Sequence, residues 1–97
     1  MSRKLAKIRD SVLPILKKHD VKRAAVFGSY ARGEETRSSD VDMMVEFSGK
    51  KSLLDLVGLQ QDLEETTGVK FDVSTFKAIH PLIKDQVYRE RVAILGR

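Results

Sequence analysis

The chain has 97 residues, of which 41% are apolar and 33% charged, and its net charge is +4 at pH 7. These values predict one small globular domain spanning residues 1–97 and exclude a disordered chain. Cysteine is absent, which excludes disulfides and thiolate metal sites. No apolar run reaches membrane-spanning length, so we expect no membrane contact and a cytoplasmic location. The positive charge suits a polyanionic partner and plain solubility equally, so it decides nothing alone.

The first part of the chain predicts a helix followed by a buried strand. Apolar residues recur at helical spacing over residues 3–18, with basic residues between them, and His19 stands at the predicted end. Pro14 lies inside this pattern, where it should kink or split the helix. Residues 22–27 predict a strand, because residues 24–27 form a short apolar run that stops at Gly28, which is typical of a strand buried on both faces.

The middle of the chain predicts a turn, a loop and a second strand. Residues 28–33 have the composition of a turn that enters a short helix, and residues 34–39 form a polar loop without an apolar residue. Residues 41–47 then alternate between apolar and mostly polar positions, as in a strand with one face in the core. The apolar side of this strand comprises Val41, Met43, Val45 and Phe47.

The last part predicts a helix, a strand and a final helix. Ser52 and Asp55 have the spacing of a capping box, and Gly68 suits the C-terminal stop of that helix. Its predicted apolar face comprises Leu53, Leu56, Leu59 and Leu63. Residues 69–75 alternate again, and a final helix is predicted over residues 81–95. The order helix, strand, short helix, strand, helix, strand, helix predicts an α/β fold, a sheet with helices packed on it.

Two carboxylates stand at the start of the second predicted strand. Asp40 and Asp42 are two positions apart, and alternate residues of a strand point to the same face. The two side chains can therefore converge on one cation, and hard oxygen ligands suit Mg²⁺ or Mn²⁺. An isolated Asp-x-Asp pair is more often merely solvated or turn-forming, so the interpretation needs a second signal.

That second signal is the small-residue turn that precedes the carboxylates. Gly28 lets the backbone approach a ligand, and Ser29 adds a hydroxyl donor where a helix N-terminus would favour phosphate. Arg32 is a candidate for pairing with phosphate because its planar guanidinium suits that task. A phosphate-binding turn followed by a carboxylate pair is the minimum equipment for transferring a phosphoryl or nucleotidyl group.

The run of Gly28-Ser29, ten residues and then Asp40-Val41-Asp42 resembles the signature of the DNA polymerase beta-type nucleotidyltransferase superfamily. Within that superfamily, nearly the whole chain is similar to the minimal nucleotidyltransferases, the antitoxin partners of HEPN-domain toxins. The resemblance implies the superfamily fold, a small mixed sheet with helices packed on it. It also implies a third carboxylate on a neighbouring strand, and Asp72 is the residue that the chain offers there.

The function implied by the resemblance is metal-dependent transfer of AMP from ATP to a tyrosine hydroxyl of a cognate HEPN RNase toxin. The metal would be Mg²⁺, with Mn²⁺ as an alternative, and Asp72 would also activate the attacking hydroxyl. The candidate residues are thus Asp40, Asp42 and, from the resemblance, Asp72 for catalysis and metal binding. Gly28, Ser29 and Arg32 are the candidates for nucleotide binding. In so short a chain we expect the acceptor to come from another molecule, in a homo- or hetero-oligomer.

Two alternatives remain open from the sequence. The chain could be a catalytically silent antitoxin that neutralises the toxin by binding alone, although its intact motif residues count against this. It could also transfer a nucleotide to RNA or to a small molecule, but it lacks the appendage expected for either, and we expect no direct nucleic-acid binding. On the predicted last helix, a second apolar stripe offers a partner surface or a further part of the core. This stripe comprises Tyr88, Val92 and Leu95.

Overall fold

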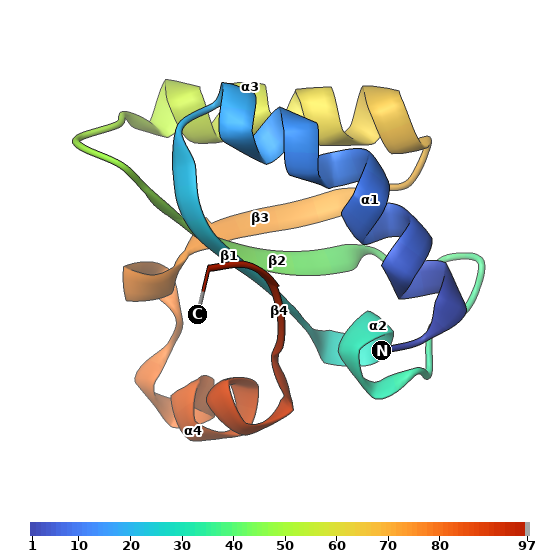
Figure 1. Cartoon of the computed structure of the whole chain (residues 1–97). Helices are drawn as coiled ribbons and strands as arrows, with labels where there is room; N and C mark the ends of the chain where they lie inside the picture. Colours follow the sequence, from blue (N-terminus) through green and yellow to red (C-terminus); the bar gives the residue numbers. More distant parts are fainter. Residues whose placement is uncertain (97) are drawn as a thin grey trace.

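The computed structural model describes residues 1–96 and shows four α-helices, one 3₁₀ helix and four strands within them (Figure 1). The helices are α1 (Arg3–Lys18), α2 (Gly28–Arg32), α3 (Leu53–Thr67), η1 (Phe76–Ala78) and α4 (Pro81–Glu90). The strands are β1 (Val21–Phe27), β2 (Val41–Phe47), β3 (Phe71–Thr75) and β4 (Val92–Leu95). In the described residues, no helix combines the length and the apolar character that a membrane crossing requires.

The four strands form one sheet in the order β3-β2-β1-β4. Strand β1 is antiparallel to both β2 and β4, whereas β2 and β3 are parallel. The predicted mixed sheet is therefore confirmed. Because β2 and β3 run in the same direction, their N-terminal ends lie side by side, with Asp42 paired in register with Asp72.

Helices α1 and α3 cover one face of the sheet (Figure 1). The predicted periodicity of the first helix is confirmed, and its apolar side chains pack with alternate residues of the strands in the main core. The helix runs unbroken through Pro14, so the predicted split is wrong. Pro14 is exposed, and on the solvent side the carbonyl group that loses its helical partner can bind water instead.

Helix α3 begins and ends as its sequence predicts. Ser52 and Asp55 form a reciprocal capping box, and Gly68 adopts the left-handed conformation just after the last turn. Leu59 and Leu63 are fully buried. The predicted apolar face is wrong at Leu53, which is 74% exposed, because the first turn of the helix extends beyond the edge of the core.

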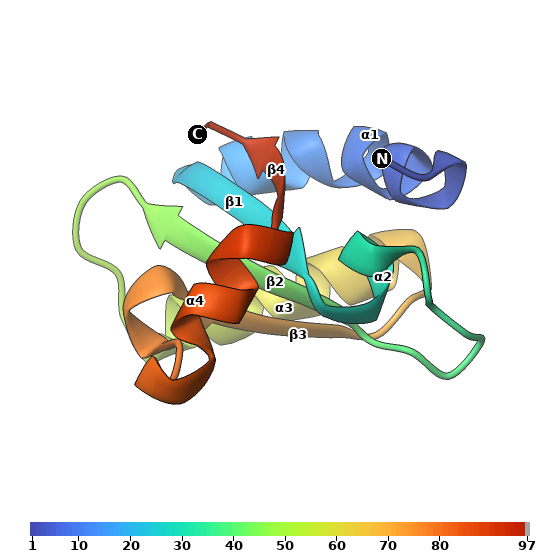
Figure 2. The ribbon, with the colours of Figure 1, turned by 90° about the horizontal axis from the view of Figure 1, so that it is seen from below.

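Helix α4, with η1 before it, lies over the opposite face of the sheet (Figure 2). A second, smaller apolar cluster joins the middle of this face to these two elements. It comprises Ala25, Met44, Phe76, Ile79 and Val87. The middle of β1 is thus buried on both faces, as predicted. The prediction of one core face for β2 is wrong at Met44, which is fully buried under η1 and α4 on the second face. The two ends of this second face carry polar side chains.

The predicted final helix over residues 81–95 is wrong over residues 91–95. Helix α4 ends at Glu90, and the chain continues as β4, which pairs with β1. Ile94 is buried there as a strand residue, and Val92 and Leu95 pack against the main core. The predicted stripe of Tyr88, Val92 and Leu95 is therefore divided between a helix and a strand. Pairing with β4 satisfies the backbone groups of β1 that would otherwise form an open sheet edge.

Candidate functional site

The predicted carboxylates lie at the N-terminal ends of the two parallel strands. Asp42 on β2 and Asp72 on β3 are register partners, so their side chains leave the same face of the sheet, away from α1 and α3. Asp42 is half-buried and Asp72 is exposed. The structure therefore brings these two residues together, although they are 30 positions apart in the sequence.

Gly28 packs directly against Asp42. It has a φ of 73°, a left-handed conformation that favours glycine. A Cβ atom placed on Gly28 would lie 2.3 Å from the Asp42 Oδ2 atom, which is closer than real contacts allow. The turn after β1 can approach the Asp42 carboxylate only because no side chain stands between them.

The electrostatics of Asp42 reflect its crowded position. Partial burial raises the pKa of the Asp42 carboxyl above its ordinary value, and the negative charges of Asp72 and Asp40 raise that pKa further. Arg32 acts in the opposite direction and lowers the pKa. The ionised carboxylates repel one another at this end of the sheet, so a cation placed among them would be bound favourably.

Asp40 occupies the border of the site. It precedes β2 by one residue, is exposed, and contributes to the raised pKa of Asp42. Asp40 also lines a cavity of about 440 Å³ together with Tyr30 and basic residues. The basic residues of this cavity are Lys4, Arg37 and Lys70. Asp40 is thus close enough to Asp42 to act on its charge while remaining open to solvent.

Arg32 ends α2 and pairs with two glutamates. Its Nε atom donates to Glu34 Oε1 at 2.8 Å, and its Nη1 atom donates to Glu90 Oε2 of α4 at 3.1 Å. These contacts raise the pKa of the Arg32 guanidinium. They hold its charge beside the carboxylates, and a phosphate would have to compete with them. The sequence gives no sign of the Glu90 contact, because the two residues are 58 positions apart.

Ser29 lies in the first turn of α2 and is half-buried. The residue before the helix, Phe27, provides no side-chain cap for the amide groups of that turn. The predicted short helix is confirmed, although it begins one residue earlier, at Gly28. Ser29 is followed by Tyr30, which is buried in the main core and so anchors this turn. Phosphate binding by Ser29 stays a prediction.

The fit of these residues to a metal ion depends on the ligands that a substrate adds. Among residues 1–96, no three histidine, cysteine or acidic side chains are arranged to hold a metal ion by themselves. Mg²⁺, however, is usually bound by one or two carboxylates together with substrate phosphates and water, rather than by an all-protein cage. Asp42 and Asp72 at matching register positions, with Asp40 nearby, fit a site of that kind.

Sequence comparison defines the class of protein. The family model described as nucleotidyltransferase domain matches residues 5–94. A Methanocaldococcus jannaschii protein with the provisional name protein adenylyltransferase is 53% identical over 88 residues, which cover 91% of this chain and 95% of the relative. The chain therefore belongs to the nucleotidyltransferase domain family, and its enzymatic activity is nucleotidyl transfer. The protein adenylyltransferase MntA of Thermococcus cleftensis is 38% identical over 74 residues, 76% of this chain and 75% of that protein.

Solved structures confirm the fold. A structure described provisionally as a minimal nucleotidyltransferase is 37% identical, with a TM-score of 0.79, over 92% of this chain and 91% of the other. The tri-AMPylated Shewanella oneidensis HEPN toxin in complex with its MNT antitoxin contains a chain of the same fold. That chain is 16% identical, with a TM-score of 0.73, and the match covers 95% of this chain and 72% of the other.

Proposed function

We propose that this protein transfers AMP from ATP to a tyrosine hydroxyl of a HEPN RNase toxin, and that it acts in this way as the antitoxin. The observation that carries the proposal is the pairing of Asp42 with Asp72 directly beside Gly28. Two further facts support it. The named relatives are protein adenylyltransferases, and a HEPN toxin that carries AMP groups occurs in complex with an antitoxin of the same fold.

The donor nucleotide would be held by the turn between β1 and α2. Gly28 and Ser29 bring backbone amides and a hydroxyl to the triphosphate, and so fix it for in-line attack on the α-phosphorus. Arg32 adds positive charge at the rim, where the contacts with Glu34 and Glu90 orient it. Asp40, Asp42 and Asp72 would hold Mg²⁺, with Mn²⁺ as the alternative, and the ion would supply neutralising charge for the triphosphate.

The acceptor hydroxyl would meet Asp72. This carboxylate is exposed, so a side chain carried by another protein can reach it. Asp72 accepts or orients the proton of the hydroxyl while the oxygen attacks the α-phosphorus and pyrophosphate leaves. Asp42 is half-buried and lies against Gly28, so it is the better placed of the two to face the nucleotide.

The test is the intact mass of the HEPN protein after incubation with this chain, ATP and magnesium. We expect the toxin mass to rise by one or more AMP groups and its RNase activity to fall in parallel. The Asp42→Asn variant, which cannot provide the carboxylate, is the control and should leave the mass unchanged. Loss of RNase activity without any change in mass would replace this proposal with a silent antitoxin that acts by binding. Label transferred from ATP to RNA would show that the acceptor is not a protein.

A further inference from the structure

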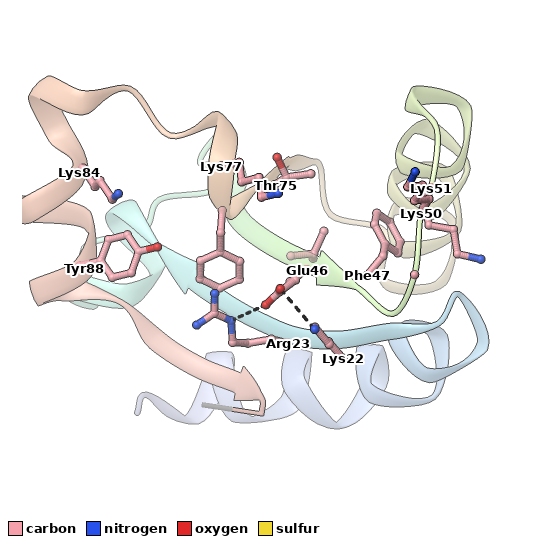
Figure 3. Close-up of a pocket in the computed structure, with 13 residues that line it drawn as sticks. Lys22, Arg23, Glu46, Phe47, Lys50, Lys51, Thr75, Lys77, Lys84 and Tyr88 are labelled. Carbon is pink, nitrogen blue, oxygen red and sulfur yellow. Dashed lines mark ion pairs between the residues drawn. The ribbon is translucent and has the colours of Figure 1, made fainter.

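A basic groove lies at the other end of the sheet face that carries the carboxylates. It has a volume of about 730 Å³ and is lined by the first residues of β1, the end of β2, the loop before α3, the region of η1, and α4 (Figure 3). Glu46 on its floor is four residues along β2 from Asp42, which corresponds to about 13 Å of extended strand. The groove is therefore separate from the carboxylate site.

The charge of the groove is strongly unbalanced. One acidic side chain, Glu46, faces six basic ones: Lys22, Arg23, Lys50, Lys51, Lys77 and Lys84. Glu46 pairs with Lys22 at 3.4 Å and with Arg23 at 3.2 Å, while Lys51 pairs with Asp20 at 3.1 Å. In the part of the chain that the structure describes, the other three lysines form no ion pair. A ligand for this groove should therefore carry negative charge.

Exposed apolar residues flank the groove on two sides. Leu53 and Leu54 follow the lysine pair of the loop and are 74% and 81% exposed. Leu82 and Ile83 precede Lys84 on α4 and are 88% and 46% exposed. Figure 3 shows Lys50 and Lys51 at one end of the groove and Lys84 at the other. Exposed apolar side chains that adjoin polar ones mark sites of interaction with another protein.

The aromatic rings of the groove do not favour a nucleic acid. Phe76 is buried, and the guanidinium carbon of Arg23 lies 3.9 Å from its ring centre. Arg91 and Lys84 lie 4.6 and 5.9 Å from the ring centre of Tyr88. Single-stranded nucleic acids bind by stacking bases on open aromatic faces, and here cations of the protein lie over the rings.

We propose that the basic groove docks an acidic, amphipathic segment of the protein that accepts the adenylyl group. The acidic residues of that segment would pair with Lys50, Lys77 and Lys84, and its apolar residues would cover the exposed leucines. The groove would thus bind the partner away from the carboxylate site, in a position that brings the acceptor hydroxyl of the partner to Asp72. This inference rests on the proposed function for the identity of the partner, namely the HEPN toxin.

The experiment compares two double variants that change the net charge equally. Lys77→Glu/Lys84→Glu reverses two charges of the groove, and Lys7→Glu/Lys17→Glu reverses two exposed charges on α1, on the opposite face of the sheet. Affinity for the HEPN toxin is measured without ATP, so the result does not depend on AMP transfer. We expect the groove variant to bind about 10-fold or more weakly, with the largest difference at low salt, and the α1 variant to stay within about twofold of the wild type.

Two further measurements complete the test. Leu54→Gln/Leu82→Gln changes only exposed side chains, so it should fold normally and also weaken toxin binding, and thermal unfolding confirms the fold of every variant. Single-stranded oligouridylate serves as the nucleic-acid probe. Wild-type affinity for the toxin in the groove variant would overturn the proposal. So would oligouridylate binding that the groove variant loses while toxin binding persists.

Discussion

The two ends of one sheet face carry side chains of opposite charge. At the end where β2 and β3 begin, three aspartates lie near one another, and Arg32, which lowers the pKa of Asp42, is itself paired with two glutamates. At the other end, six cations surround Glu46, which pairs with two of them. The apolar cluster around Met44 separates the two ends.

This difference indicates two kinds of task. The carboxylate end is destabilised by its own charges, since burial and the neighbouring aspartates raise the pKa of Asp42. A bound cation and nucleotide would stabilise such a site, and this kind of unfavourable charge is typical of a catalytic site. In the basic groove, Glu46 is paired with Lys22 and Arg23, whereas other lysines of the lining, among the described residues, form no ion pair. Such a surface is typical of a site that recognises a partner.

Replacing Asp42 with Asn should reduce AMP transfer by about 1,000-fold or more, because a metal-binding, half-buried carboxylate is lost. The variant should bind the HEPN toxin as tightly as the wild type, since the groove is unchanged. Transfer is measured from labelled ATP, and binding is measured without nucleotide. Undiminished transfer in this variant would refute the assignment of chemistry to the carboxylate end.

Replacing Gly28 with Ala should reduce transfer by about 100-fold and destabilise the fold by about 1–3 kcal/mol. The added Cβ would collide with Asp42 Oδ2, and the backbone at φ 73° is strained for alanine. Gly33→Ala is the matched control, because Gly33 has the same φ and nothing within 4 Å of its added Cβ. The control should lose stability in chemical unfolding by about 1 kcal/mol while transfer persists. Equal loss of transfer in both variants would show that strain alone, not the approach to Asp42, explains the effect.

The raised pKa of Asp42 makes a pH-dependent prediction for stability. Its folded-state pKa lies above the unfolded value, so ionisation of Asp42 costs stability at neutral pH, and that cost disappears as the pH falls through the folded pKa. Without metal or nucleotide, Asp42→Asn should therefore have a higher Tm than the wild type near neutral pH. The difference should shrink on acidification. A lower Tm for the variant at neutral pH would mean that Asp42 stabilises the fold.

The smallest effect is expected at the capping box of α3. Ser52→Ala removes the acceptor for the Asp55 amide and should cost about 1 kcal/mol in chemical unfolding. AMP transfer at a temperature well below Tm should be unchanged, because α3 covers the sheet face opposite the carboxylates. Reduced transfer by a fully folded Ser52→Ala protein would connect α3 to the site.

The sequence predicts most of this architecture because its local signals are strong. Caps, glycines and alternation define α1, α3 and the first three strands, and the register of β2 and β3 follows once they pair. The last segment could not be predicted correctly, because apolar residues at 92, 94 and 95 fit a helix or a strand equally well. Pairing with β1 decides between them, and that contact is distant in the sequence.

The site could be predicted only in part for the same reason. Gly28, Asp40 and Asp42 stand close together in the sequence, and resemblance added Asp72, so the candidate residues were available from the chain alone. The contact of Arg32 with Glu90 and the gathering of lysines in the groove depend on segments far apart in the sequence. In the sequence, Lys50 and Lys51 look like ordinary solvated residues. Only the fold places them opposite Lys84.

The most direct test of this division of labour is the steady-state kinetics of AMP transfer to the HEPN toxin. For Lys77→Glu/Lys84→Glu, the account predicts that KM for the toxin rises by about 10-fold or more while kcat stays at the wild-type value, because only partner binding is changed. A fall in kcat at unchanged KM would contradict this prediction, since it would mean that the lysines of the basic groove take part in the transfer step itself.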